Sequence, residues 1–281
     1  MENRIESFAD QLREENLSPN TINSYLGDIK DFLSFLKAKG VMLCPQVEKR
    51  HLDAFTEELT SRGMKKSTLY RKSTTVKKFF HFLMVRELID DNPSQTLERP
   101  RVERKISHCL LRKDIDAMVA AIDPNHSAAL RDRLIIEILY ATGIKVSELI
   151  QLEIGDFDSN RGHLVIQGPP SPRTLGLEED LIGLLEDYIG TLKIQGDASG
   201  LFVNQRGDKI SRQSIWKVVK KYAHKADLSQ EINPHSFRNA HVVGEILKGV
   251  PLREIMSNLG IQGSLDTAYY QQCLKREENK G

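Results

Sequence analysis

The sequence of 281 residues lacks long hydrophobic runs, has only three cysteines and carries almost no net charge. No window approaches the roughly 18 uninterrupted apolar residues of a membrane span, so we expect no association with a membrane. Cys44, Cys109 and Cys273 are too scattered for a disulfide framework or a zinc site, which favours a reducing cytoplasm. The first residues contain no apolar signal core, so we do not expect secretion.

The formal net charge of +1 hides an uneven distribution of basic residues. No Asp or Glu lies between Arg62 and Arg86. A second basic segment runs from Arg206 to Lys225, and Asp208 is its single acidic residue. Two such segments are typical of two surfaces that bind one polyanion such as double-stranded DNA, although each would also suit a solvated helix face. The candidate DNA-binding residues come from these two segments, with Arg173 added from between them: Lys65, Lys66, Arg71, Lys72, Lys77, Lys78, Arg173, Arg212, Lys217, Lys220 and Lys221.

Residues 1–90 have the pattern of an all-helical domain. Their apolar residues recur at three- and four-residue steps, the period of amphipathic helices. We expect helices over about 5–12, 19–39, 51–62 and 67–88. Ser18 suits the N-cap of the second helix, Pro19 its first turn and Gly40 its end.

Residues 91–107 are polar and basic without a period that would bury them, and we interpret them as a linker. The alternative is a surface loop of one large domain. Residues 108–281 predict a second, mostly helical domain with a small sheet. Its expected helices begin at about Asp114 and then cover 128–142, 147–152, 181–192, 212–225, 239–248 and 252–259, and strands 163–167 and 173–177 flank a proline-rich loop.

Four short motifs occur in order along the chain: Leu17–Tyr25, Ala141–Leu149, Pro234–Arg238, and Leu259-Gly260 followed by Tyr270. Together they make the sequence resemble the tyrosine recombinase (phage integrase) family, most closely its Xer-like bacterial members, over nearly the whole chain. The resemblance implies a mainly α fold with a small β-sheet, built as a two-domain DNA clamp. The first domain would be the helical, SAM-like core-binding domain, and the second a mixed catalytic-type domain.

The resemblance also implies a chemistry. In this family a tyrosine hydroxyl attacks a DNA phosphodiester and forms a phosphotyrosyl intermediate, with no cofactor and no metal ion. Two arginines hold the phosphate, an acidic residue orients the first of them, and a hairpin lysine protonates the leaving oxygen. By resemblance Tyr270 is the nucleophile, His235 and Arg238 form the His-x-x-Arg pair, and Glu148 is the acidic support.

Two of the phosphate-pocket positions carry a different residue in this chain. Lys145 stands in place of the first arginine, and its ammonium group does not provide the planar, two-pronged donor array of a guanidinium. Gly168 stands where the hairpin lysine is expected, so the general acid is missing. Arg173 lies just beyond and is able to touch a phosphate, but its pKa is too high for it to yield a proton near neutrality.

Two histidine positions are also substituted. Ile261 follows the leucine-glycine pair where the family has a histidine, and Asn239 stands where a second histidine often follows the arginine. His241 is two residues further on, and on a helix it would point elsewhere. These departures indicate a degenerate active site.

Each retained residue also has a structural explanation. Tyr270 would pack a terminal helix, His235 would cap a helix, Lys145 would lie on the surface, and Glu148 would pair locally with Lys145.

Two hypotheses follow, and they leave open whether the chain is an enzyme. In the first, it is a DNA-binding recombinase or integrase whose strand transfer is impaired or lost. In the second, it is a catalytically inactive architectural or regulatory DNA-binding protein, or the silent partner of an active recombinase. Either protein would act on DNA in the cytoplasm, as a homo-oligomer or in a mixed recombinase complex.

Overall fold

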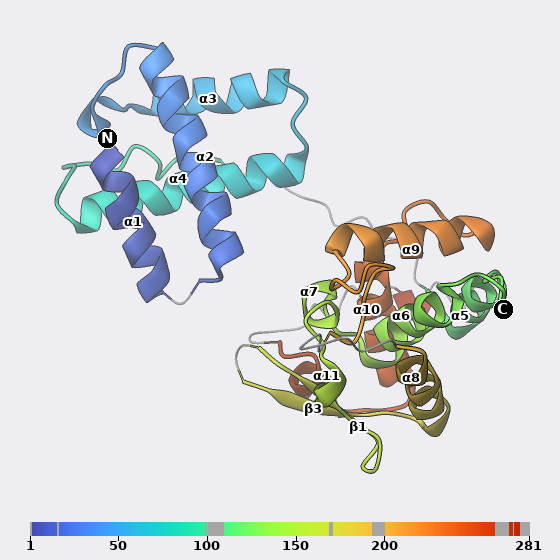
Figure 1. The fold of residues 1–281 in the computed structure, drawn as a ribbon. Helices are drawn as coiled ribbons and strands as arrows, with labels where there is room; N and C mark the ends of the chain where they lie inside the picture. The colour runs from blue at the N-terminus through green and yellow to red at the C-terminus, as the bar shows by residue number, and fades with distance from the viewer. Residues whose placement is uncertain are drawn as a thin grey trace. The chain divides into compact units, whose positions relative to one another are not determined.

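The computed structural model describes residues 2–15, 17–98, 100, 110–168, 171–192, 200–261, 270–271 and 273–275 of the chain (Figure 1). It divides into two compact units, Met1–Arg104 and Lys105–Gly281. No helix among the described residues is long and apolar enough to cross a membrane. The mainly helical fold with a small sheet that the sequence predicted is confirmed.

The first unit is helical where the apolar period predicted helices. Ser18 caps the second helix as expected, because its Oγ accepts a hydrogen bond from the Thr21 N–H at 3.2 Å and Pro19 follows in the first turn. The elements are α1 (Glu2–Glu14), α2 (Pro19–Ala38), the 3₁₀ turn η1 (Cys44–Gln46), α3 (Lys49–Ser61) and α4 (Lys66–Val85).

Phenylalanine rings from all four helices form the core of the first unit. Phe8 meets Phe79 edge to face with ring centroids 5.3 Å apart, and Phe32 meets Phe55 at 5.0 Å. Leu97, which we expected in the linker, packs against this core. The described part of the chain up to residue 98 therefore includes core residues of the first unit, and residues 101–107 of the expected linker lie outside the described residues.

The second unit surrounds α6, which is buried on most of its circumference. Gly143 ends α6 in the left-handed conformation, with φ of +60°, as its position in the sequence predicted. The elements are α5 (Arg112–Ala120), α6 (Ala129–Thr142), α7 (Val146–Leu149), η2 (Ile154–Asp156), β1 (Phe157–Asp158), β2 (His163–Ile166), β3 (Arg173–Gly176), α8 (Glu179–Thr191), α9 (Arg212–Lys225), α10 (Pro234–Leu247) and α11 (Leu252–Asn258).

The sheet of the second unit is antiparallel in the order β1-β2-β3. Arg173 begins β3 opposite Ile166, the last residue of β2, so the arginine lies at the end of the hairpin where the chain turns. The sequence predicted β2 and β3 but not β1, because a strand of two residues is too short to show a period.

The start of α10 differs from the expected one. The helix begins at Pro234 rather than near residue 239, because Asn233 caps it: the Asn233 Oδ1 accepts the His235 N–H at 2.9 Å. His235 and Arg238 are therefore three residues apart within the helix and lie on one face.

The cysteines also differ from the expected pattern. Cys44 is free and buried, whereas Cys273 is in a disulfide bond, a pairing that the scattered spacing did not predict.

Candidate active site

Arg238 connects two loops of the second unit through its guanidinium group. Its Nη1 donates to the Gly143 carbonyl oxygen and its Nη2 to the Leu259 carbonyl oxygen, both at 2.8 Å. Burial lowers the pKa of Arg238, and the nearby Glu148 carboxylate opposes that shift. The arginine is thus a partly buried cation in a fixed position between the end of α6 and the turn after α11.

Glu148 forms its ion pair with Arg173 and not with the ammonium group of Lys145. Its two carboxylate oxygens accept hydrogen bonds from Nη1 and Nη2 of Arg173 at 3.1 and 3.0 Å. Its Oε2 also accepts the backbone N–H of Lys145 at 2.7 Å. The Lys145 side chain is exposed, and its Nζ has no hydrogen bond or ion pair with any residue the structure describes. The predicted local pairing of Glu148 with Lys145 therefore involves only the lysine backbone.

The Arg173 guanidinium also contacts the turn that holds Arg238. Its Nε donates to the Asn258 carbonyl oxygen at 2.6 Å, one residue before the carbonyl that Arg238 binds. Gly260 has a φ of +61°, and a Cβ there would lie 3.2 Å from the Arg173 Nη1. Glycine at position 260 therefore allows both the left-handed backbone conformation and the close approach of the Arg173 guanidinium.

Gly143 is also required by its surroundings. A Cβ at this position would lie 2.7 Å from Cδ2 of His241 and 2.8 Å from Cδ2 of Leu259. His241 packs behind Gly143 with its Nδ1 3.2 Å from the Tyr140 carbonyl oxygen, and burial lowers the pKa of its imidazole. His241 therefore packs against the residue whose carbonyl oxygen Arg238 binds, and the charge of Arg238 contributes to lowering the pKa of His241.

Tyr270 is 9% exposed and packs in an apolar cluster with Val243, Ile255 and Leu259. Its hydroxyl donates to Oδ1 of Asn239 at 3.5 Å, so the residue at the second-histidine position contacts the tyrosine. Asn239 directly follows Arg238 on α10, and Tyr270 shares an apolar cluster with Leu259, whose carbonyl oxygen Arg238 binds, so the phenol lies in the same region as the guanidinium. Tyr270 therefore has the packing role that the sequence suggested, and its role as the nucleophile stays a prediction. Residues 262–269 lie outside the described residues.

His235 lies exposed in the first turn of α10. Desolvation by the surrounding protein lowers the pKa of its imidazole, and the positive charge of Arg238 lowers it further. The neutral form is therefore favoured near pH 7, so His235 offers a hydrogen-bonding ring and not a further cation.

The remaining substituted positions do not provide the missing groups. Gly168 has a φ of +131° and no atom lies within 4 Å of the place that a Cβ would take, so a side chain has space there but the backbone conformation disfavours one. Ile261 packs against the apolar cluster around Tyr270. Pro169 and Pro170 lie outside the described residues.

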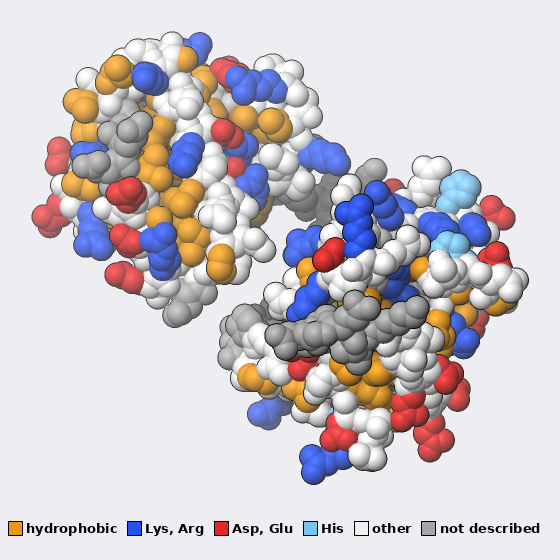
Figure 2. Space-filling model, viewed as in Figure 1, with side chains coloured by type: hydrophobic (Ala, Val, Ile, Leu, Met, Phe, Trp, Pro, Cys, Tyr) orange, Lys and Arg blue, Asp and Glu red, His pale blue; other side chains and the backbone are white. Residues whose placement is uncertain are grey.

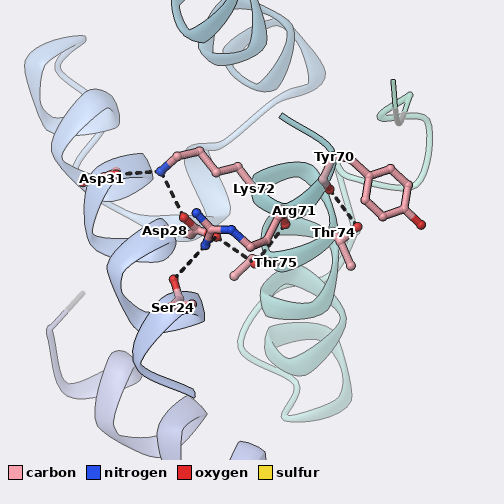
Figure 3. Close-up of polar contacts among 8 residues, drawn as sticks. All are labelled: Ser24, Asp28, Asp31, Tyr70, Arg71, Lys72, Thr74 and Thr75. Atoms are coloured by element: carbon pink, nitrogen blue, oxygen red, sulfur yellow. Dashed lines mark hydrogen bonds and ion pairs between the residues drawn. The ribbon is translucent and has the colours of Figure 1, made fainter. Parts of the chain in front are cut away.

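Lysines and arginines of the first basic segment are largely paired within the first unit. Lys72 is 4% exposed, and its Nζ lies 3.0 Å from Asp28 and 2.6 Å from Asp31 (Figure 3). Arg71 also pairs with Asp28, and Lys78 lies 2.5 Å from Glu15. Buried as it is, Lys72 does not lie on a surface, which corrects its assignment as a DNA-binding residue.

Other residues of this segment remain near the surface. The Lys77 Nζ donates to the Gln95 carbonyl oxygen at 3.2 Å, and Lys65 and Lys66 are exposed at the start of α4.

The second basic segment lies on α9 and is more accessible. Figure 2 shows Lys and Arg side chains gathered over this helix. Arg212 and Lys217 are exposed and form no ion pair with any residue in the described ranges. Lys221 is also exposed and donates to the hydroxyl of Tyr222 at 3.0 Å.

Trp216 is the chain's one tryptophan and stands within this basic segment, although the charge pattern of the segment gave it no role. The residue is 43% exposed, and the Nζ of Lys220 lies over the indole ring, 5.6 Å from the ring centroid, in a cation–π contact.

Comparisons with known proteins match both units of the chain. The phage integrase family matches residues 108–277, and the phage integrase N-terminal SAM-like domain matches residues 5–87. Tyrosine recombinase XerC of Roseiflexus castenholzii is 31% identical over 281 residues, covering 96% of this chain and 88% of that protein. Tyrosine recombinase XerD of Oceanobacillus iheyensis is 29% identical and covers 98% of this chain and 95% of that protein.

Solved structures share the fold. The XerH site-specific recombinase bound to palindromic difH substrate has a TM-score of 0.75 at 21% identity, covering 97% of this chain and 83% of that chain. A lambda integrase dimer bound to a COC′ core site has a TM-score of 0.73 at 14% identity, covering 94% and 95%. With the family motifs matched over both units, this chain belongs to the phage integrase family of tyrosine recombinases and is similar to its Xer members.

Proposed function

We propose that this chain binds double-stranded DNA and transfers a DNA strand to Tyr270, at a rate far below that of a recombinase with the full set of catalytic groups. The observation that carries the proposal is the convergence of Arg238, Arg173, Glu148 and Tyr270 around the turn at Leu259 and Gly260. Two guanidinium groups beside a tyrosine hydroxyl suit a phosphodiester, because cations stabilise the charge that builds on its oxygens.

The proposed reaction is a phosphoryl transfer without a cofactor or a metal ion. The Tyr270 oxygen attacks the phosphorus and loses its proton, the bond to the 5′ oxygen breaks, and that oxygen takes up a proton as it leaves. Asn239 holds the tyrosine hydroxyl through its side-chain oxygen. His235, favoured in its neutral form, hydrogen bonds to the phosphate without adding a charge.

The slow rate follows from the missing proton donor. Gly168 stands where the family's hairpin lysine would protonate the leaving oxygen, and general acid catalysis contributes about 10²–10⁴-fold to a rate. Arg173 does not replace that function because a guanidinium group does not release its proton near neutral pH.

A second candidate function is an architectural or regulatory DNA-binding protein, or the silent partner of an active recombinase. Ile261 favours it, because the residue at the expected histidine position packs into the apolar cluster. In this alternative Tyr270 keeps only its packing role.

Binding to duplex DNA is common to both candidates. The XerH relative in fold is bound to a difH substrate, and lambda integrase is bound to DNA as a dimer or a tetramer. By analogy, each unit of this chain contributes a DNA-contacting surface, and the chain assembles on DNA with further copies or with another recombinase. The location of the protein in the cytoplasm stays a prediction.

The test is a covalent-adduct assay with nicked duplexes made from a sequence that the protein itself selects from a random pool. We expect a faint protein–DNA band with the wild-type chain and none with Tyr270→Phe, while both bind the intact duplex equally. Absence of the band in the wild type supports the inactive alternative. A band that Tyr270→Phe retains would rule out Tyr270 as the nucleophile.

A further inference from the structure

Arg173, and not the side chain of Lys145, pairs with Glu148, the residue that the resemblance gives as the acidic support. By resemblance, an acidic residue three positions after the family's first arginine orients that arginine, and here the carboxylate of Glu148 holds Arg173 instead, at 3.1 and 3.0 Å. The two side chains are only 11% and 10% exposed, so the pair is fixed within the protein. Lys145, at the arginine position itself, is exposed.

The backbone next to Arg173 aligns it with Arg238. Arg173 binds the carbonyl oxygen of Asn258 at 2.6 Å, and Arg238 binds that of the next residue, Leu259, at 2.8 Å. Gly260 follows directly, and its missing side chain leaves space for the Arg173 guanidinium. Two consecutive carbonyl groups therefore hold two guanidinium groups in one small region.

We propose that Arg173, projecting from β3, supplies the second guanidinium of the phosphate pocket in place of residue 145. This inference rests on the proposed binding of DNA. Of the five N–H groups of a guanidinium, Nε and one hydrogen on each Nη bind Asn258 and Glu148, which leaves two for phosphate oxygens. Because Glu148 already fixes the orientation of Arg173, the contact requires little further ordering of the side chain.

The test maps phosphate contacts by charge removal. The wild-type chain selects a duplex from a random pool, and each phosphate near its centre is replaced in turn by an uncharged methylphosphonate. The pocket phosphate is the one whose replacement weakens the wild type but no longer affects Arg238→Ala. Affinity for the charged and the neutral duplex is then measured for Arg173→Lys, for Lys145→Ala, and for Arg161→Lys as a control on an exposed hairpin arginine, whose side chain is 78% exposed.

We expect neutralising this phosphate to weaken the wild type and Arg161→Lys by about 10-fold or more, the effect of losing a charged hydrogen bond. In Arg173→Lys, the methylphosphonate should weaken binding by a smaller factor than it does in Lys145→Ala. A lysine keeps the positive charge but lacks the two remaining guanidinium N–H groups that would contact the phosphate. A merely structural role of Arg173 would weaken binding to both duplexes equally and leave this ratio unchanged. Thermal unfolding of each variant verifies that the fold is intact.

A rescue variant sharpens the test. In Lys145→Arg combined with Arg173→Lys, an arginine returns to the position that Glu148 supports in the family, and we expect the full penalty for the neutral phosphate to return. The inference is overturned if Arg173→Lys keeps the full penalty or if Lys145→Ala abolishes it. Salt-independent binding by the wild type, or no phosphate that depends on Arg238, would instead overturn the proposed function itself.

Discussion

The two basic segments of this chain are similar in sequence but differ in what their charges do. On α4, Arg71, Lys72 and Lys78 pair with carboxylates from α2 and from the end of α1, so much of the positive charge is neutralised inside the first unit. On α9, Arg212 and Lys217 are exposed without an ion pair among the described residues. The difference teaches that a run of lysines without nearby acids in sequence is not by itself a basic surface.

The physical reason is that helices bring distant residues together. Asp28 and Asp31 lie more than 40 positions before Lys72 in the sequence, with separations of 43 and 41 residues for the Arg71–Asp28 and Lys72–Asp31 pairs. These carboxylates lie on α2, which packs against α4 (Figure 3). A charged side chain that is buried needs such a partner, because an unpaired charge in the interior is costly.

The largest expected effect is a loss of stability when the ion pairs between α4 and α2 are broken. Among the residues that the structure describes, Asp28→Ala leaves the buried Lys72 with only Asp31 as an ion-pair partner. We expect a loss of about 3–5 kcal/mol in the free energy of unfolding of the first unit. Chemical denaturation measures it. Asp31→Ala is the matched control, because the side chain of Asp31 is 65% exposed, and its loss should be much smaller. Equal losses in the two variants would contradict a structural role centred on Asp28.

The next effect concerns DNA binding by α9. The double variant Arg212→Ala and Lys217→Ala removes two exposed cations. We expect the negative slope of log K against log salt concentration to become shallower by about 2, one for each lost phosphate contact. Fluorescence anisotropy over a salt series measures it. An unchanged slope would mean that α9 does not touch the DNA backbone.

A smaller effect is expected from the same change at the start of α4. Lys65→Ala with Lys66→Ala matches the α9 double variant in the number of charges removed, and both lysines are exposed. We expect the salt slope to change by about 1–2 and the stability to change by less than about 0.5 kcal/mol. If stability falls by several kcal/mol instead, these two lysines belong with the paired residues of α4.

The smallest effect is a pH-dependent one at the Lys78–Glu15 pair. The hydrogen bond from Lys78 lowers the pKa of Glu15 below its ordinary value of 4.5. Because the folded-state pKa is the lower one, the pair's contribution is present above about pH 4.5 and is lost as the pH falls through the folded-state value. Lys78→Met should therefore cost about 0.5 kcal/mol at pH 7 and less at pH 3. A cost that does not change with pH would indicate that packing, not charge, is responsible.

Much of the local structure followed from the sequence. The period of apolar residues predicted α1 to α4 and most helices of the second unit, Ser18 and Pro19 predicted the start of α2, and Gly143 predicted the end of α6. These signals depend on residues within a few positions of one another. The short strand β1 did not follow, because it is too brief to show a period. The start of α10 at Pro234 was missed although Asn233 and Pro234 carry the same local signal as Ser18 and Pro19, an N-cap residue before a proline in the first turn.

The sequence by itself determined the family and the helical fold, because ordered motifs and apolar periods are local features of the chain. Only the tertiary structure decided which charges meet. The pairing of Glu148 with Arg173 spans 25 residues, and the contact of Arg238 with Gly143 spans 95. Ion pairs depend on distances through space and on burial, and a linear sequence specifies neither until the helices and the hairpin have packed together.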